Sequence, residues 1–385
     1  MQDIPQFAQM QSAIFPFMGS LVFIVLHIYI YKALFKSLST KVFVRLAWKI
    51  LICVNALACI TYLFVRNAPN VPLALYFLLS FCLGIAFVCA MATFLYQCAS
   101  LIIMTLHTKS KRAFWRHKIR LTLCILSLLM LGFGTYNGIK TPRIIEHTLE
   151  IKGLNAPLHI AVLSDVHIGG LMREAKVREI VEMTNALEAD MIFITGDLVD
   201  APLHNVESAV NELQNLHAKN GIFYVLGNHE YFHDVQNILE KLRALGFQVL
   251  VNESYIFDER VNIVGIADFM GWRVGYLEPD FKQSFAQINP SLPTILLAHQ
   301  PKVVYFLKET YDKVDLVVSG HTHAGQIFPL SLAILLQQPY ISGLHTFNNA
   351  HHSQVYVSQG TGFWGPPMRI GSESEITLLH LLPTE

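Results

Sequence analysis

The sequence predicts two parts joined end to end, a membrane region of about four helices followed by an α/β domain with a substantial mixed sheet. Of its 385 residues 53% are hydrophobic and 15% charged, and the mean hydropathy of +0.41 is too apolar for an ordinary soluble protein. Residues 1–140 contain 13 of the 28 basic residues and one of the 28 acidic residues, which leaves 15 basic and 27 acidic residues in the remainder. We therefore predict a transmembrane anchor at 1–140 and the α/β domain at 149–385.

Four apolar stretches in the first part, at 13–34, 46–65, 72–106 and 119–136, are each long enough to cross a bilayer as a helix, which takes about 20 residues. The first has no basic segment before it and is therefore not expected to be a cleaved signal peptide. Basic residues concentrate at 36–45 and 109–120. Because basic loops stay in the cytoplasm, this pattern predicts a four-pass protein whose α/β domain is extracytoplasmic.

The cysteines exclude two classes of site. All six lie in the apolar part, at Cys53, Cys59, Cys82, Cys89, Cys98 and Cys124, and the α/β domain has none. Neither a disulfide framework nor a thiolate zinc site is therefore available in that domain.

Short apolar runs alternate with amphipathic stretches after residue 149. Strands are expected within 158–167, 190–200, 221–232, 247–253, 255–258, 262–269, 294–301, 314–323, 354–362 and 375–382, and helices at 173–187, 206–217 and 235–245. Strands that alternate with helices and are then followed by consecutive strands indicate a mixed sheet. Ligands of such sheets bind beyond the carboxyl ends of the strands.

Polar residues that can bind metal follow five of these strands: Asp165 and His167; Asp197 and Asp200; Asn228, His229 and Glu230; His299; and His321 and His323. Each alone would be a capping or turn residue. Five in series are better explained by a cation, because burying so many acids and imidazoles at one edge without one would be costly. Oxygen and imidazole ligands without thiolate suit two divalent ions such as Mn, Fe or Zn, an arrangement that supports phosphoryl transfer.

The motifs DVH, GDLVD, GNHE, the lone histidine of LLAHQP and GHTH resemble, in order and spacing, the calcineurin-like metallophosphoesterases. The resemblance covers residues 157–382, and the tail GTGFWGPPMRIG with EITLLHL is similar to the bacterial membrane-associated phosphodiesterases of that family. It implies two mixed β-sheets sandwiched by helices, a metal-dependent phosphoric ester hydrolase, and a place in a bacterial inner membrane.

The resemblance also implies a role for each motif residue. Asp165, His167 and His323 would bind the first metal ion, Asn228, His299 and His321 the second, and Asp197 would bridge both. His229 would be the catalytic histidine, donating a hydrogen bond or proton to the substrate, and hydroxide bridging the metals would attack the phosphorus. Asp200 would orient a ligand of the first ion or would only cap a turn.

One position departs from the pattern of this branch. Ala324 follows GHTH where a glycine is usual, and we expect that the backbone there does not need a positive φ angle.

The segments around the expected site bear on the substrate and the partners. The apolar run 327–336 is expected either to be buried or to form an exposed lip at the membrane surface, extended by Phe363 and Trp364. Arg369 would bind a phosphate or form a structural pair. The bilayer is the expected partner and a phospholipid or lipid-linked phosphoester, monoester or diester, the expected substrate. Protein partners are not indicated, and the acidic domain disfavours nucleic acid.

Two other functions remain open at this point. The protein could be a non-catalytic metal-binding membrane sensor or scaffold, or a pyrophosphatase acting on a nucleotide-linked lipid. His229 disfavours the sensor, because a structural metal site does not need a residue beyond the seven ligands.

Overall fold

The computed structural model describes residues 6–307 and 313–384, and side chains from Ile14 onward. It divides into two compact units. Of the described residues, the helical unit contains 11–139 and 365–370, and the sheet unit contains 6–10, 140–307, 313–364 and 371–384.

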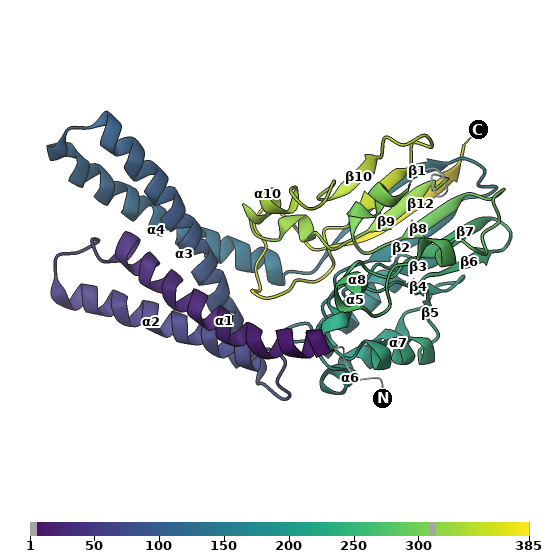
Figure 1. The fold of residues 1–385 in the computed structure, drawn as a ribbon, viewed down its shortest axis with the longest axis horizontal. Coiled ribbons are helices and arrows are strands. Elements are labelled where there is room, and N and C mark those ends of the chain that lie inside the picture. Colours follow the sequence, from purple (N-terminus) through teal and green to yellow (C-terminus); the bar gives the residue numbers. More distant parts are fainter. Residues whose placement is uncertain (1–5, 308–312, 385) are drawn as a thin grey trace. The chain divides into compact units, whose positions relative to one another are not determined.

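Four long helices form the helical unit: α1 (Gln6–Ile30), which continues as a π-helical turn at Tyr31–Phe35, α2 (Val42–Val65), α3 (Leu73–Leu106) and α4 (Lys109–Ile139). All four are long and apolar enough to cross a membrane. Figure 1 shows that the α1–α2 and α3–α4 turns lie at the same end of this unit. These two turns contain the two basic segments. The charge pattern and the order of the helices therefore both place these turns on the same side of the membrane.

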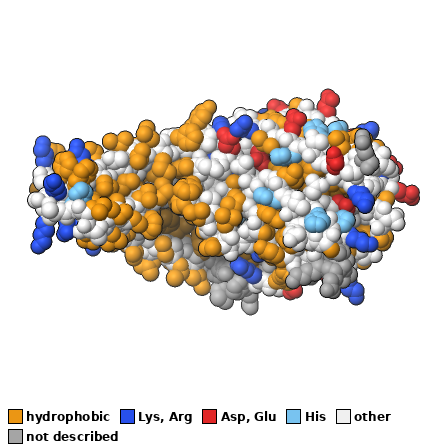
Figure 2. Space-filling view, turned by 90° about the horizontal axis from the view of Figure 1, so that it is seen from above, with side chains coloured by type: hydrophobic (Ala, Val, Ile, Leu, Met, Phe, Trp, Pro, Cys, Tyr) orange, Lys and Arg blue, Asp and Glu red, His pale blue; other side chains and the backbone are white. Residues whose placement is uncertain are grey.

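Hydrophobic side chains cover most of the visible face of the helices, and Lys and Arg gather at one end of them (Figure 2). Many of these side chains are large and exposed, as at Phe17, Leu57, Phe94 and Leu128. Such a surface requires an apolar surrounding, and the protein is a membrane protein.

A buried polar cluster joins three of the helices. Asn55 of α2 lies with its Nδ2 2.9 Å from Nε2 of His27 of α1 and donates to the carbonyl oxygen of Cys82 of α3 at 3.2 Å. Hydrogen bonds of this kind fix helix register inside a membrane, where the polar groups have few other partners.

The sheet unit contains two mixed six-stranded sheets (Figure 1), which confirms the predicted fold class. The first has the order β1 (Arg143–Ile151), β12 (Glu375–Pro383), β2 (Leu158–Leu163), β3 (Met191–Ile194), β4 (Ile222–Tyr224) and β5 (Gln248–Val249). The second has the order β10 (Gly343–Thr346), β11 (Gln354–Val357), β9 (Leu316–Ser319), β8 (Thr294–Leu297), β7 (Val261–Gly265) and β6 (Glu253–Phe257). Strands β2 to β5 are parallel to one another, as are β7, β8, β9 and β11.

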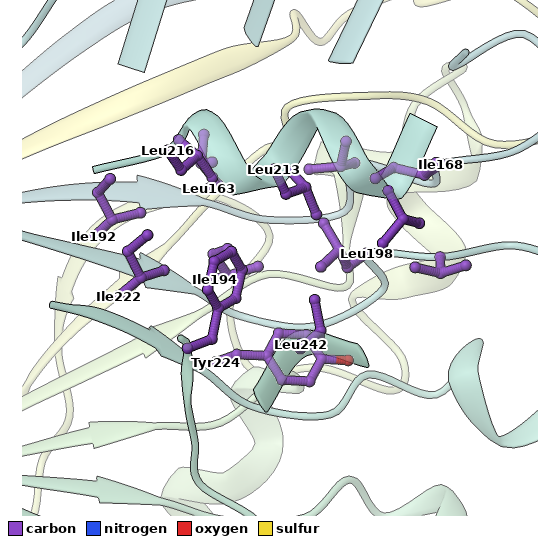
Figure 3. Close-up of a cluster of buried hydrophobic side chains, with 14 of the residues drawn as sticks. Leu163, Ile168, Ile192, Ile194, Leu198, Leu213, Leu216, Ile222, Tyr224 and Leu242 are labelled. Atoms are coloured by element: carbon purple, nitrogen blue, oxygen red, sulfur yellow. The ribbon is translucent and has the colours of Figure 1, made fainter. Parts of the chain in front are cut away.

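Both faces of the central strands are buried. Alternate residues of β2 and β3, such as Ile160 and Phe193, meet Ile263 and Leu316 in the core between the sheets. The other residues face the helices α5 (Glu174–Asn185), α6 (Leu203–Asn211) and α7 (Val235–Ala244) across the cluster drawn in Figure 3. Burial on both faces explains why these strands read as continuous apolar runs.

The structure differs from the sequence prediction in two strands and one segment. Strand β1 begins at Arg143, ahead of the expected boundary at 149, and pairs in parallel with β12. The sequence analysis did not predict β1 because it contains charged residues and is mostly exposed. It did not predict β10 because alternate residues of that strand are exposed. Residues 365–370, expected to belong to the α/β domain, cluster with the helices.

Candidate metal centre

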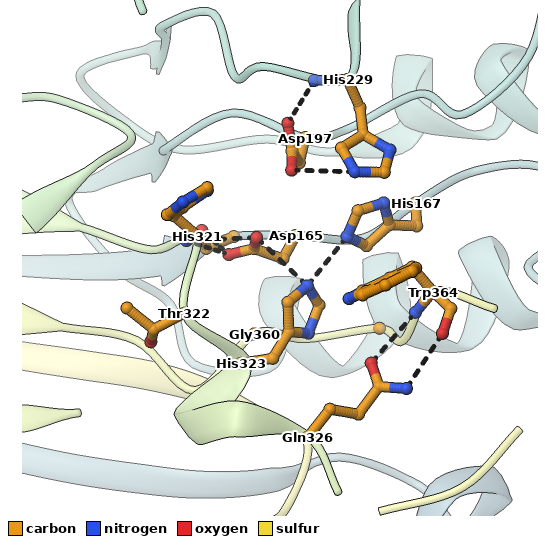
Figure 4. A network of polar contacts seen from close by, with 12 residues as sticks. Asp165, His167, Asp197, His229, His321, Thr322, His323, Gln326, Gly360 and Trp364 are labelled. Carbon is orange, nitrogen blue, oxygen red and sulfur yellow. Dashed lines mark hydrogen bonds and ion pairs between the residues drawn. The ribbon is translucent and has the colours of Figure 1, made fainter. Parts of the chain in front are cut away.

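The carboxyl ends of five strands bring the predicted ligands together (Figure 4). Asp165 and His167 follow β2, Asp197 follows β3, Asn228 and His229 follow β4, His299 follows β8, and His321 and His323 follow β9. Both sheets therefore contribute, which is how residues 158 positions apart can share one site.

One group of ligand atoms comes from Asp165, His167 and His323. Nε2 of His167 lies 2.9 Å from Nε2 of His323, which lies 3.3 Å from a carboxylate oxygen of Asp165. All three side chains are buried, and the ligand atoms lie within 4.8 Å of one another.

A second group comes from Asp197, His299 and His321. Nε2 of His299 lies 3.2 Å from Asp197, 3.2 Å from Nδ1 of His321 and 3.1 Å from Oδ1 of Asn228. Asp197 also lies within 4.8 Å of ligand atoms of His167 and His229. Its carboxylate is therefore the one nearest to both groups, where a bridging ligand would have to be.

Partners on the far side of two rings set their tautomers. Nδ1 of His167 lies 2.7 Å from a carboxylate oxygen of Asp200, and Nδ1 of His299 lies 2.8 Å from the carbonyl oxygen of Thr195. Since both partners accept hydrogen bonds, each Nδ1 carries a proton, and each Nε2 faces the centre, where its lone pair binds a cation when the ring is neutral. This is the orientation that a metal-binding imidazole needs.

The donor set fits a pair of divalent first-row ions. It consists of carboxylate and amide oxygens and neutral imidazole nitrogens, converging in a buried volume and without thiolate. So many acceptor atoms aimed at one another would repel without a cation between them. Asp165, His167, Asp197, Asn228, His299, His321 and His323 are the residues that would hold the ions.

Ionisation also suits metal binding. Burial opposes ionisation of Asp197, but the positive charges of His299 and His229 outweigh it and hold the pKa of its carboxyl well below the ordinary value. Burial, with the charge of His299, lowers the pKa of His321 to about 3, so this imidazole is neutral. Burial lowers the pKa of His299, but the negative charges of Asp197 and Asp165 raise it well above the ordinary value, so this imidazole carries a proton that a bound cation would displace. Anionic carboxylates and neutral imidazoles are the forms that bind metal.

His229 stands apart from the ligands because its side chain is 28% exposed, whereas His299 is fully buried. Its Nδ1 lies 2.7 Å from Asp200 and its Nε2 3.8 Å from Asp197. Burial would lower the pKa of His229, but the negative charges of Asp200 and Asp197 raise it to about 10. Cations bound at Asp197 would offset that charge and bring this pKa back toward neutrality, where imidazole exchanges protons best.

The backbone of the ligand loops is unusual. Asp165, His167, Asp197, His321 and His323 all have φ angles between 48° and 71°, a region that such residues seldom adopt. Ala324 also has φ 50°, so the expectation that this position needs no positive φ angle is wrong. The alanine occupies the left-handed conformation in spite of its Cβ atom.

Two glycines allow the loops to approach one another. A Cβ atom on Gly227 would lie 2.1 Å from the amide nitrogen of Asp197, and one on Gly320 would lie 2.3 Å from a carboxylate oxygen of Asp165. The glycines of GNHE and GHTH are therefore required by close packing beside the ligands.

Sequence reasoning missed one pair beside the centre. The side chain of Gln326 accepts from the backbone nitrogen of Trp364 at 3.2 Å and donates to its carbonyl oxygen at 2.9 Å. The ring of Trp364 lies 6.3 Å from that of His229 (Figure 4). The motif places Gln326 three residues after His323, but nothing in it indicates a partner 38 residues away.

The structure places two further predicted residues, Asp200 and Arg369, differently with respect to the candidate metal centre. Asp200 contacts both His167 and His229, so it holds a candidate ligand and the candidate catalytic histidine at once. Arg369 is not brought to this group: it is fully buried and belongs to the segment that clusters with the helices. Its role in phosphate binding stays a prediction, and its burial counts against it.

Comparisons with known proteins identify the class. Residues 158–325 match the family model of the calcineurin-like phosphoesterases. A metallophosphoesterase of Helicobacter pylori is 39% identical over 327 residues, covering 84% of this chain and 86% of that one. A transmembrane protein with a metallophosphoesterase domain from Danio rerio is 31% identical over 79% of this chain and 73% of its own. Among solved structures, a dimetal phosphatase from Danio rerio is similar over 54% of this chain and 88% of its own, with 12% identity and a TM-score of 0.36.

Fold, site and relatives together define a metal-dependent phosphoric ester hydrolase. The chain belongs to the calcineurin-like metallophosphoesterases, as the sequence motifs predicted, and it carries this domain behind four membrane-spanning helices.

Proposed function

We propose that this protein hydrolyses the phosphoester bond of a phospholipid or lipid-linked substrate, with a dimetal centre in an extracytoplasmic domain. The observation that carries the lipid preference is an exposed apolar surface next to the centre. We call it the apolar lip; it consists of Phe328, Leu330, Leu332, Leu335, Leu336 and Trp364.

The lip is continuous with the metal-binding loop. Helix α10 (Leu330–Ile334) begins seven residues after His323, and a Cβ atom on Gly325 would lie 2.4 Å from the nitrogen of Ser331. No residue of α10, all of which is described, is buried, and Leu336 is 87% exposed. Ile327 is buried, whereas residues 328–336 are exposed or partly exposed, which supports the lip rather than a buried helix or strand.

A soluble domain seldom leaves so many large apolar side chains together in water. Here the domain is tethered to a bilayer: α4 ends at Ile139 and β1 begins at Arg143, so the three residues between them span at most about 14 Å. An apolar surface on a domain held this close to lipid is suited to contact acyl chains or the interfacial region.

Each residue of the site has a task in such a reaction. Two divalent ions held by the seven ligands would lower the pKa of water and neutralise charge on the phosphate oxygens. His229 presents Nε2 on the open side of the centre, with Nδ1 held by Asp200, and can donate a hydrogen bond or a proton to the leaving oxygen. Asp200 orients two imidazole rings, that of the candidate catalytic His229 and that of the candidate metal ligand His167.

The test compares hydrolysis of bis-p-nitrophenyl phosphate with that of phospholipids by detergent-purified protein, with Mn or Zn supplied. We expect turnover of both classes and a higher kcat/KM for the lipids. His229→Ala should keep its metal and lose about 10²- to 10⁴-fold in kcat, the usual contribution of general acid–base catalysis. His217→Ala, on an exposed histidine away from the motifs, is the matched control and should leave kcat unchanged.

Three results would contradict parts of this proposal. Loss of both ions in His229→Ala would remove its assignment as the catalytic histidine. Hydrolysis of the soluble diester but of none of the phospholipids would overturn the proposal of a lipid substrate, while the assignment as a hydrolase would stand. Inactivity on all esters with two ions bound would favour a sensor.

A further inference from the structure

A six-residue segment of the C-terminal part, Gly365–Ile370, is embedded in the helical unit. Met368 and Arg369 are fully buried, and the backbone nitrogen of Arg369 donates to the carbonyl oxygen of Gly134 in α4 at 2.9 Å. The segment is therefore bound by the helices through both its side chains and its backbone.

Three helix glycines line the groove that receives it. A Cβ atom on Gly138 would lie 2.5 Å from the nitrogen and 2.7 Å from the Cα of Met368, and one on Gly134 would lie 2.8 Å from its Cγ. A Cβ atom on Gly84 of α3 would lie 2.9 Å from the Cε of Met368. The spacing Gly134-x-x-x-Gly138 is one that allows close backbone approach between membrane helices, but here a short peptide occupies the space.

A fourth helix glycine shows that this lining is specific. Among the described residues, nothing lies within 4 Å of a Cβ atom built on Gly132, although it is in the same helix and only two residues before Gly134. The contacts therefore belong to one face of α4.

Both ends of the segment are fastened to one residue beside the metal centre. Gln326 holds the backbone of Trp364, the residue before the segment, through its amide group. Its carbonyl oxygen accepts from the hydroxyl of Ser372, two residues after the segment, at 3.1 Å. Since Gln326 follows His323 by three residues, Trp364 and Ser372, which flank the segment, are held by the loop that carries His321 and His323.

We propose that Gly134 and Gly138 are positioning residues for substrate binding. By holding residues 365–370 they fix the indole of Trp364 beside His229, where it contacts the organic group of the ester. The helices then contribute to catalysis as well as to anchoring. The inference rests on the hydrolase activity and not on a lipid substrate, so a soluble aromatic ester can test it.

The experiment uses the full-length protein with bis-p-nitrophenyl phosphate. In Gly138→Val the new side chain meets backbone that cannot move aside, and we expect KM to rise about tenfold, as for the loss of one aromatic contact, with kcat and bound metal nearly unchanged. Gly132→Val, which places the same side chain on the same helix, should leave KM unchanged. An equal change in the two variants would overturn the proposal.

A double-mutant cycle tests whether the effect passes through Trp364. Trp364→Ala alone should raise KM by the same factor, and Gly138→Val should add nothing to it. Additive effects would show that the groove acts only on general stability and would overturn the positioning role. Should Gly138→Val fail to fold, Gly134→Ala decides, because the three atoms nearest to its Cβ atom belong to the side chains of Met368 and Ile370 and not to backbone.

Quenching of tryptophan fluorescence by acrylamide separates failure of this inference from failure of the proposed function. With Trp48, Trp115 and Trp272 replaced by phenylalanine, Trp364 is the one tryptophan left to excite selectively. We expect faster quenching in Gly134→Ala than in the parent, whichever ester the protein hydrolyses. Unchanged quenching would overturn the inference even in an active enzyme.

Discussion

The carboxylate of Asp197 is the residue on which the two groups of ligands depend. It lies 3.2 Å from His299 and 3.8 Å from His229, and its other oxygen accepts from the backbone nitrogen of His229 at 2.8 Å. A single side chain thus orders a candidate ligand of the second ion and the candidate catalytic histidine.

Replacing this carboxylate by an amide tests that position. Asp197→Asn keeps the shape but removes the charge, so we expect loss of bound metal and a fall of at least ~10²-fold in kcat/KM. Metal content by mass spectrometry and turnover of bis-p-nitrophenyl phosphate measure the two effects. Asp258→Asn makes the same change on an exposed turn and should alter neither. Two ions retained at full occupancy in Asp197→Asn would remove the bridging role.

The sequence predicted which residues the structure brings together at this edge, but it did not predict their geometry. Asp165, Asp197 and His299 each follow an apolar strand, and strand ends that meet at one edge are a general property of such sheets. The left-handed backbone at His321 and His323 is not visible in the residue types, since an extended HTH segment would point both rings to one face. The hydrogen bonds of Gln326 to Trp364 depend on tertiary packing alone.

Helix α10 has no covering layer, since none of its five residues is buried. The helix has five residues and is too short to be stable through its own hydrogen bonds. It is placed instead by its contact with the loop at Gly325. Its leucines therefore form a surface fixed relative to the metal centre.

The apolar lip yields a prediction about substrate form. In Leu332→Ser with Leu336→Ser, kcat/KM for phospholipid in vesicles should fall about tenfold, because less apolar surface is available to contact lipid. The kcat/KM for soluble bis-p-nitrophenyl phosphate should not change. Leu344→Ser, on an exposed leucine of β10, is the control and should leave both values as they are. Equal losses on both substrates would count against contact with lipid.

Element by element, the sequence predicted best where burial was most complete. Strands β2, β3, β8 and β9 are apolar except for His159, Thr294 and Ser319, and they lie where expected. Strand β1 carries charges at Arg143, Glu146 and Glu150 and is held by its partner β12, which is distant in sequence. A strand that depends on pairing rather than on its own apolar pattern has no local signal.

For the whole molecule, the division of charge is the feature with the clearest consequence. The basic turns of the helical unit lie at one end of that unit (Figure 1). The chain segments that connect the helical unit with the sheet unit, one ending before residue 142 and the other beginning after residue 364, contain few basic residues. By the positive-inside rule, the sheet unit is expected outside the cytoplasm.

Reporter fusions test this topology directly. A phosphatase or fluorescent reporter joined after residue 113 and another at the C-terminus should give opposite results, the first cytoplasmic and the second extracytoplasmic. A fusion within 67–71, the link between α2 and α3, serves as a control and should report an extracytoplasmic position. Reporters at 113 and at the C-terminus on the same side would disprove the four-pass arrangement.

The embedded segment also has a consequence for the order in which the protein is made. Gly138 and Met368 are separated by 230 residues (368 − 138), which takes about 10–50 s to synthesise at 5–20 residues per second. During that interval the four helices have left the ribosome, but the groove between Gly84 and Gly138 lacks its occupant. The helices are thus made before the sheet unit, but their packing is completed only after most of that unit has been synthesised.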